Sequence, residues 1–97
     1  MKTLINNSIS DKLIPEDMGS DYKGCIKYCL KFQPQGGYTF DVMEKYSRIS
    51  KALDASGDDS IEFEDQDAET LKGIINKVAF AVFHADIHGF MKAVKEL

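Results

Sequence analysis

A run of acidic residues in the middle of the chain constrains most strongly how this protein can fold. Residues 54–69 (DASGDDSIEFEDQDAE) hold eight of the sixteen Asp and Glu residues in the 97-residue chain and no Lys or Arg. The acidic residues of the run are Asp54, Asp58, Asp59, Glu62, Glu64, Asp65, Asp67 and Glu69. Because nothing within the run neutralises these charges, they must stay in water or meet a positive group. The run therefore predicts an anionic face on a folded domain.

The length and composition of the chain predict one small domain. With 97 residues, 43% of them hydrophobic, the chain can form a single modest core and is too short for a deep substrate cleft. The first ten residues lack the apolar centre of a secretion signal, and the longest apolar run, 78–83, is too short to span a bilayer. We therefore expect a cytoplasmic protein.

Residues 22–32 alternate between two sets of side chains, which predicts a half-buried antiparallel strand. The set on the expected core side is Tyr22, Ile26, Tyr28, Leu30 and Phe32. The set on the expected solvent side is Lys23, Cys25, Lys27, Cys29 and Lys31. We expect two further short strands, one at the N-terminus and one at 61–64.

Apolar residues at helical spacing predict two longer helices. The first covers residues 40–54, with Thr39 as its N-cap. The second covers residues 67–82 and is capped by Asp65 or Asp67. A helix unbroken from there to the C-terminus would be on the order of 45 Å long, too long for a compact domain of this size. We therefore expect a break near residues 84–86 and a short final helix.

These elements predict an α+β fold, in which a small antiparallel sheet packs against two or three helices in a single domain, residues 1–97. The predicted core residues are Ile26, Tyr28, Leu30, Phe32, Val42, Tyr46, Ile49, Leu53, Leu71, Ile75, Val78, Val82, Phe90 and Val94.

Part of the acidic run resembles the calcium-binding loop of an EF-hand. Asp54, Ser56, Asp58 and Asp65 stand at ligand positions 1, 3, 5 and 12 of such a loop. Three features depart from the pattern: Asp59 replaces the glycine of the sharp turn, Asp65 replaces the bidentate glutamate, and the following helix is polar where it should be apolar, at Gln66, Asp67 and Thr70. EF-hands also normally pair, and the sequence holds no second loop. A calcium-binding domain with these four ligands is therefore an alternative, beside the simpler interpretation of a turn, a strand and a capped helix.

Other metal sites and catalytic sites find little support in the sequence. Cys25, Cys29, His84 and His88 supply the ligand number of a zinc site. On a strand, however, the two cysteines would lie about 13 Å apart, too far for one zinc ion or a disulfide. No Gly-rich phosphate loop is present. We therefore expect no enzymatic activity, no catalytic residues, no cofactor and no metal.

The eight carboxylates of residues 54–69 are therefore the predicted partner-binding residues. Stabilisation of a helix N-terminus accounts for two or three of them, at about 0.3–1 kcal/mol each, and does not account for Asp58, Asp59, Glu62 and Glu64. An array of carboxylates can compete for surfaces rich in Lys and Arg and can steer association. We expect a basic protein surface as partner, and direct contact with neither nucleic acid nor a membrane.

Two stretches of the chain resemble small accessory proteins of tailed bacteriophages and prophages. The stretches are Gly36-Gly37-Tyr38-Thr39-Phe40-Asp41 with Met43, and Ile61-Glu62-Phe63-Glu64-Asp65 with Asp67, Leu71 and Lys72. The resemblance covers about residues 36–75 and assigns no activity and no functional residue. It implies a bacterial-virus context, in which small acidic chains are virion or assembly parts, or inhibitors of host defence proteins. Some such inhibitors, including certain anti-CRISPR proteins, mimic the charge of DNA.

The functional prediction is a non-enzymatic phage-type accessory protein that acts stoichiometrically through its acidic surface in the bacterial host cytoplasm. Its expected target is a host defence or nucleic-acid-binding protein. The alternatives are the calcium-binding domain and a small virion structural or assembly subunit. Self-association as a homodimer would use three apolar residues near the C-terminus: Phe80, Phe83 and Ile87.

Overall fold

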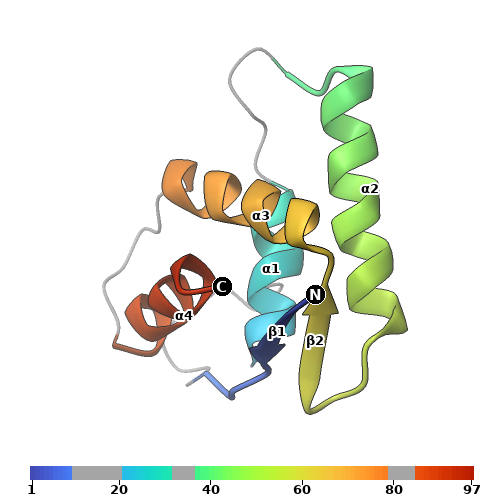
Figure 1. Cartoon of the computed structure of the whole chain (residues 1–97). Coiled ribbons are helices and arrows are strands. Elements are labelled where there is room, and N and C mark those ends of the chain that lie inside the picture. The colour runs from blue at the N-terminus through green and yellow to red at the C-terminus, as the bar shows by residue number, and fades with distance from the viewer. Residues whose placement is uncertain (10–20, 32–36, 79–84) are drawn as a thin grey trace.

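The computed structural model describes residues 1–9, 21–31, 37–78 and 85–97. Along the chain, the elements are β1 (Lys2–Ile5), α1 (Tyr22–Leu30), α2 (Phe40–Ala55), β2 (Ser60–Phe63), α3 (Asp65–Lys77) and α4 (Ala85–Lys95) (Figure 1). The two strands form an antiparallel sheet, and the radius of gyration is 12.6 Å. The predicted α+β class, with a small antiparallel sheet against helices, is therefore confirmed.

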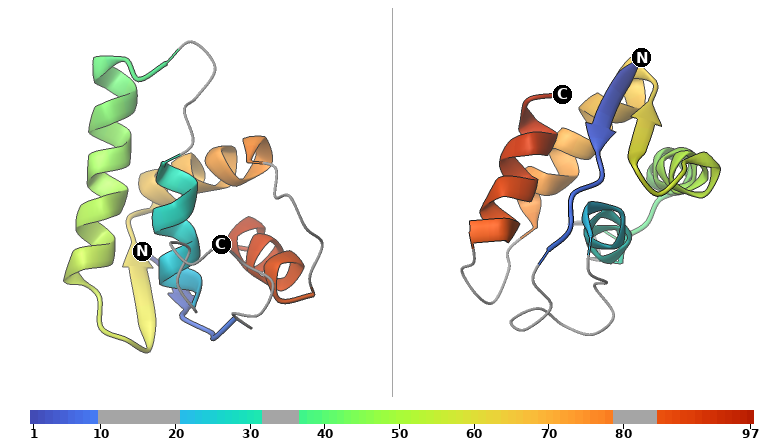
Figure 2. Two further views of the ribbon diagram at one scale, coloured as in Figure 1. Left: turned by 180° about the vertical axis from the view of Figure 1, so that it is seen from behind. Right: turned by 90° about the horizontal axis from the view of Figure 1, so that it is seen from below.

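The sheet buries one of its two faces. β1 and β2 pair from Lys2 opposite Phe63 to Ile5 opposite Ser60. On the inner face, Leu4 is 2% exposed and Phe63 is fully buried, whereas Ile5 on the outer face is 58% exposed. Figure 2 shows α2 beside β2, and α4 on the side of β1. Because two paired strands are marginally stable by themselves, the sheet depends on the packing of its inner face.

Every helix contributes to one core. Of the predicted core residues, seven are fully buried: Ile26, Ile49, Leu53, Leu71, Ile75, Phe90 and Val94. Four are partly buried and pack against this core: Tyr28, Leu30, Tyr46 and Val78. Val42 is half-buried, and Phe32 and Val82 lie outside the described residues. Tyr22, expected on the core side, is 7% exposed. The prediction missed several core residues, among them Leu4, Ile9, Cys25, Cys29, Ile61, Phe63, Ile74 and Ile87.

The predicted strand at 22–32 is wrong, because residues 22–30 form the helix α1. Its buried residues are Tyr22, Cys25, Ile26 and Cys29, which recur at the spacing of one helical face. A free cysteine behaves as a small apolar residue and is often buried. The alternation depended on placing both cysteines on the solvent side with the lysines, and that placement hid the helical pattern.

The local sequence also favours a helix at this place. The Asp21 carboxylate accepts a hydrogen bond from the backbone N–H of Gly24 at 2.8 Å, which makes it the N-cap of α1. Packing against α4 fixes the start of the helix, since the rings of Tyr22 and Phe90 meet edge to face with centroids 5.3 Å apart.

The helical spacing of Cys25 and Cys29 removes the argument that a strand holds them about 13 Å apart. One helical turn separates the two cysteines, and both are free and buried. His88 is exposed on α4, and His84 lies outside the described residues. Within the described ranges, no three His, Cys, Asp or Glu side chains gather in a group that could hold a metal ion.

The remaining helix predictions are confirmed in outline. α2 begins where expected, and the Thr39 hydroxyl accepts a hydrogen bond from the Val42 N–H at 3.3 Å. A separate final helix is present, as predicted. The predicted bounds are wrong, because α3 ends at Lys77 rather than at 82, and α4 begins at Ala85, inside the predicted break at 84–86. The predicted cap of α3 is wrong. Glu64 holds the N-cap position without a side-chain hydrogen bond, and Asp65 and Asp67 lie in the first turn.

None of the helices in the described ranges combines the length and the apolarity that crossing a bilayer requires.

Burial of both thiols predicts that the folded protein resists alkylation. Burial, reinforced for Cys25 by the nearby Cys29 and Asp21, raises the pKa of both cysteines to about 12. At pH 8, only about one thiol in 10⁴ is then the reactive thiolate. We expect intact-mass measurement to show almost no iodoacetamide adduct on the native protein and two adducts on the guanidinium-denatured protein. Equal rates of alkylation in the native and the denatured protein would contradict the burial of Cys25 and Cys29 on α1.

Candidate acidic binding surface

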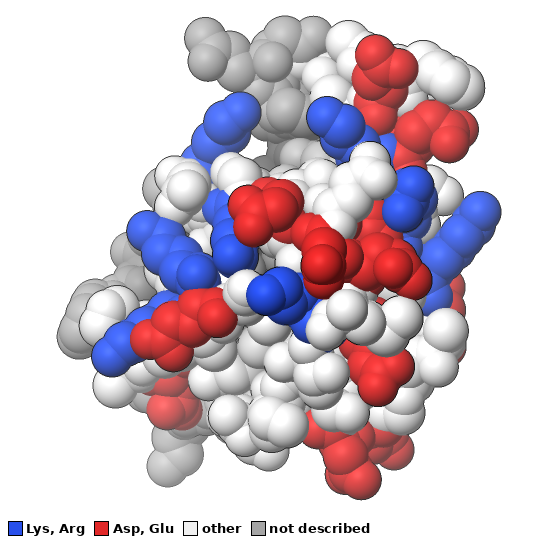
Figure 3. Space-filling view, in the orientation of Figure 1, with Lys and Arg blue, Asp and Glu red and all other residues white. Residues whose placement is uncertain are grey.

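The acidic run folds as three consecutive pieces. Asp54, Asp58 and Asp59 lie at the end of α2 and in the following loop, Glu62 lies on β2, and the rest lie at the start of α3. Seven of the eight side chains are exposed. In the view of Figure 3, acidic side chains lie over α2, β2 and the start of α3. Lys and Arg side chains lie between several of them. The predicted residues thus lie along three elements that contact one another, α2, β2 and α3.

Asp67 is the exception and does not belong to the exposed surface. Its side chain is 8% exposed, and its Oδ1 lies 2.9 Å from Nε of Arg48 on α2. Asp67 is in the first turn of α3 and shares the buried side of that helix with Ala68 and Leu71. It therefore joins α3 to α2 rather than offering its charge to a partner.

Two further carboxylates already contact a cation within the chain. Asp65 Oδ1 lies 3.3 Å from the amino group of Met1, and Glu69 Oε1 lies 3.2 Å from Lys72 Nζ. Both carboxylate side chains are 73% exposed, so each pair contributes about 0–1 kcal/mol and exchanges readily with other cations. Within residues 54–69, the exposed carboxylates without an ion pair among the described residues are Asp54, Asp58, Asp59, Glu62 and Glu64.

Asn6, which the sequence analysis did not identify, holds the loop between α2 and β2 in place. Its Nδ2 donates to the Asp58 carbonyl at 3.0 Å and to Asp21 Oδ2 at 3.1 Å. Its Oδ1 accepts from the Lys23 N–H at 3.0 Å, and its own N–H donates to the Asp59 carbonyl at 3.0 Å. One amide therefore joins β1, the start of α1 and the acidic loop.

A second contact ties the same loop to α1. Lys23 Nζ donates to the Ser56 carbonyl at 3.4 Å. Because the loop backbone is held from both sides, the positions of Asp58 and Asp59 are largely set before any partner binds. No short motif in the sequence marks this arrangement, since it depends on residues far apart in the chain.

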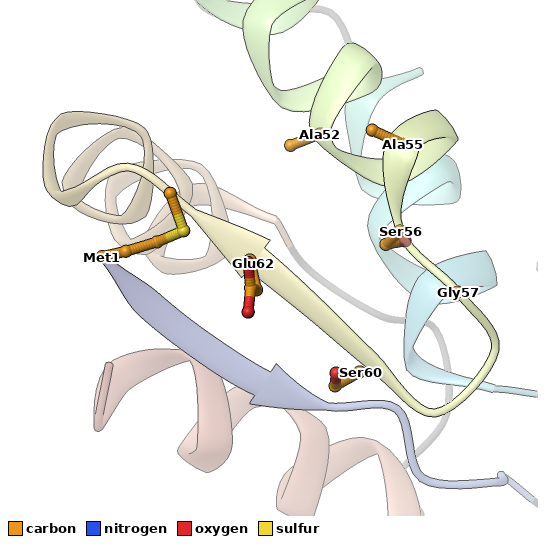
Figure 4. A pocket seen from close by; sticks show the side chains of 7 residues that line it. All are labelled: Met1, Ala52, Ala55, Ser56, Gly57, Ser60 and Glu62. Carbon is orange, nitrogen blue, oxygen red and sulfur yellow. The ribbon is translucent and has the colours of Figure 1, made fainter.

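A groove lies between the C-terminal end of α2 and the outer face of the sheet (Figure 4). Its volume is about 420 Å³. Figure 4 shows Ala52 and Ala55 on the α2 side, and Ser60 and Glu62 on β2. The residues that line the groove are Met1, Ala52, Ala55, Ser56, Gly57, Ser60 and Glu62. Among these side chains, Glu62 alone is charged, and the amino group of Met1 is paired with Asp65.

The structure does not bring the four predicted calcium ligands together. Asp58 lies before β2 and Asp65 after it, and the four residues of β2 extend about 13 Å at 3.3 Å per residue. The Ser56 hydroxyl donates to the Leu53 carbonyl at 2.7 Å, and Asp65 contacts the Met1 amino group. An EF-hand requires its ligands around a single ion, and the extended strand separates them.

Two of the three residues predicted for a homodimer contact, Phe80 and Phe83, lie outside the described residues. The third, Ile87, is 4% exposed and belongs to the core, so it cannot offer its side chain to a second copy without leaving that core. The exposed large apolar side chains of the described ranges lie elsewhere, at Met1, Ile5, Phe40 and Met43.

Comparison of the chain with protein-family models, with curated proteins and with solved structures gives no match. The functional argument therefore depends on the geometry and charge of the surface itself.

The Arg48–Asp67 pair predicts unequal effects of two aspartate substitutions on stability. Asp67→Ala removes a nearly buried acceptor and a carboxylate in the first turn of α3, and should lower the free energy of unfolding by about 1–3 kcal/mol. Asp54→Ala removes an exposed, unpaired charge and should change it by less than about 0.5 kcal/mol. Urea denaturation measures both values. Similar values would show that the pair does not stabilise the contact between α2 and α3.

The hydrogen bonds of Asn6 predict a similar contrast between neighbouring asparagines. Asn6→Ala removes three side-chain hydrogen bonds and should cost about 1–3 kcal/mol. Asn7→Ala is the matched control, because that side chain is exposed and contributes only its backbone to the described hydrogen bonds. We expect hydrogen exchange at the amide of residue 6, which donates to the Asp59 carbonyl, to speed up in the first variant alone. Unchanged exchange would show that the Asn6 side chain does not hold the loop in place.

Proposed function

We propose that this protein is a non-enzymatic binding module that holds a basic protein partner against an acidic surface. We define the acidic surface as Asp54, Asp58, Asp59, Glu62 and Glu64. The observation that carries the proposal is that these five carboxylates are exposed and have no ion pair among the described residues. They lie on or next to α2, β2 and α3, elements that contact one another. A basic partner would supply the cations that the described residues do not supply there.

The energetics of such an interaction favour fast association. Like charges held near one another raise the local negative potential, which attracts a basic surface over a distance of about a Debye length. Complementary charge can raise association rates from about 10⁵–10⁶ to about 10⁸–10⁹ M⁻¹s⁻¹ at low salt. The restraint of the 56–60 loop by Asn6 and Lys23 also lowers the entropy lost when the loop becomes ordered in a complex.

The partner class that we propose is a nucleic-acid-binding protein. Such proteins present Lys and Arg side chains that otherwise contact phosphates, and carboxylates compete for the same groups. The resemblance of residues 36–75 to phage accessory proteins makes a bacterial host protein, such as a defence protein, the source of that surface. The module would then act stoichiometrically as an inhibitor that occupies the nucleic-acid site.

Charge reversal at the acidic surface tests this proposal. The triple variant Asp58→Lys, Asp59→Lys, Glu64→Lys should reduce salt-sensitive capture of basic proteins from a bacterial lysate by about tenfold or more, because it reverses the complementary field. The matched control, Asp41→Lys, Glu44→Lys, Glu96→Lys, changes the net charge equally at exposed positions elsewhere. Quantitative mass spectrometry of the captured proteins gives the ratio.

The control separates local recognition from total charge. We expect the control variant to retain most of the capture, and thermal melting should show both variants folded. Equal loss in the two variants would mean that net charge alone attracts the basic proteins. Full capture by the first variant would refute the acidic surface as the binding site.

A further inference from the structure

The groove beside β2 has an apolar side and an acidic side, and one class of side chain matches both. Ala52 and Ala55 line one side with small apolar groups, and the exposed side chain of Met1 lies at one end (Figure 4). The Glu62 carboxylate stands on the opposite side, with neither an ion pair nor a hydrogen bond among the described residues. An occupant must therefore place apolar atoms along α2 and a positive group at Glu62.

Lysine and arginine have this composition, since each carries a cationic head on an aliphatic stem. We propose that the groove receives one Lys or Arg side chain of the basic partner, with Glu62 as the acceptor for its cationic head. The inference rests on the proposed function and names the anchoring contact within it. A volume of about 420 Å³ is within the range of about 300–1,000 Å³ typical of ligand pockets, and leaves room for a side chain and its flanking backbone.

The charges around the groove select against the other occupants. An anion would meet Glu62 with Asp58 and Asp59 in the adjoining loop, and Coulomb repulsion disfavours that arrangement. A purely apolar side chain would desolvate the Glu62 carboxylate without giving it a partner, which is costly. A cationic side chain avoids both penalties.

The groove pair should contribute more than an ordinary surface ion pair. Covering the aliphatic stem against Ala52 and Ala55 excludes water from the neighbourhood of Glu62, and a less hydrated pair is screened less by solvent. Glu64 provides a comparison within the same chain. It is an exposed carboxylate two residues further on, has no ion pair among the described residues, and does not line the groove.

The test uses the full chain and the peptide hexalysine as a defined basic probe, with binding measured by calorimetry at low and high salt. Glu62→Gln and Glu64→Gln each remove one charge, but only the first removes it from the groove. We expect Glu62→Gln to weaken binding at least about fivefold more than Glu64→Gln. We also expect amide shifts of Gly57, Ser60 and Glu62 on peptide addition to the wild-type protein.

A second pair of variants fills space without changing charge. Ala55→Leu places a larger side chain in the groove and should weaken hexalysine binding. Ser50→Leu, at an exposed position of α2 outside the groove, should leave it unchanged. Circular dichroism melting confirms that each variant is folded before its affinity is compared.

The outcomes separate the groove from the acidic surface as a whole. One outcome is salt-sensitive binding that Glu62→Gln and Glu64→Gln weaken equally and that Ala55→Leu does not alter. This outcome would overturn the groove as the binding site of the Lys or Arg side chain and leave the proposed function intact. Absence of salt-sensitive hexalysine binding by the wild-type protein overturns the groove as well, and the charge-reversal capture experiment then decides the proposed function independently.

Discussion

The pairing of β1 with β2 is the constraint on which the rest of the structure depends. It joins residues 2–5 to residues 60–63, which lie inside the acidic run in the second half of the chain. Closing so long a loop costs entropy, and burial of Leu4, Ile61 and Phe63 on the inner face offsets that cost. The same pairing places Asn6 against the acidic loop and Met1 beside the groove, so both features of the candidate site follow from it.

The acidic run is divided by the fold into a structural part and an available part. Asp67 joins α3 to α2 through Arg48, and Asp65 and Glu69 each contact a cation of the same chain. The other five carboxylates remain exposed and unpaired among the described residues. A run that is uniform in the sequence is therefore divided by the fold, because the start of α3 directs Asp67 inward while Asp65 and Glu69 remain exposed.

Local signals predicted the elements that local physics controls. The Thr39 cap and the spacing of Ile49 and Leu53 located α2, and the alternation of Ile61 and Phe63 with acidic neighbours located β2. The prediction failed at α1, where alternating lysines were given more weight than the apolar character of Cys25 and Cys29. The helical spacing of the buried residues of α1 and its Asp21 cap were present in the sequence. The contact of Tyr22 with Phe90 joins distant residues and is visible only in the tertiary structure.

The sequence by itself determined that the chain would present a concentrated negative charge and would form an α+β core, since charge and apolar periodicity are properties of consecutive residues. The tertiary structure alone decided which carboxylates are free, how the acidic loop is held, and where a groove opens. Those features depend on partners that are remote along the chain: Arg48 for Asp67, Asn6 for the loop, and Ala52 with Met1 for Glu62. The neighbours that the fold gives to a carboxylate decide whether it contributes to the structure or remains available to a partner. In the first case its charge is paired and desolvated, and in the second it stays in water.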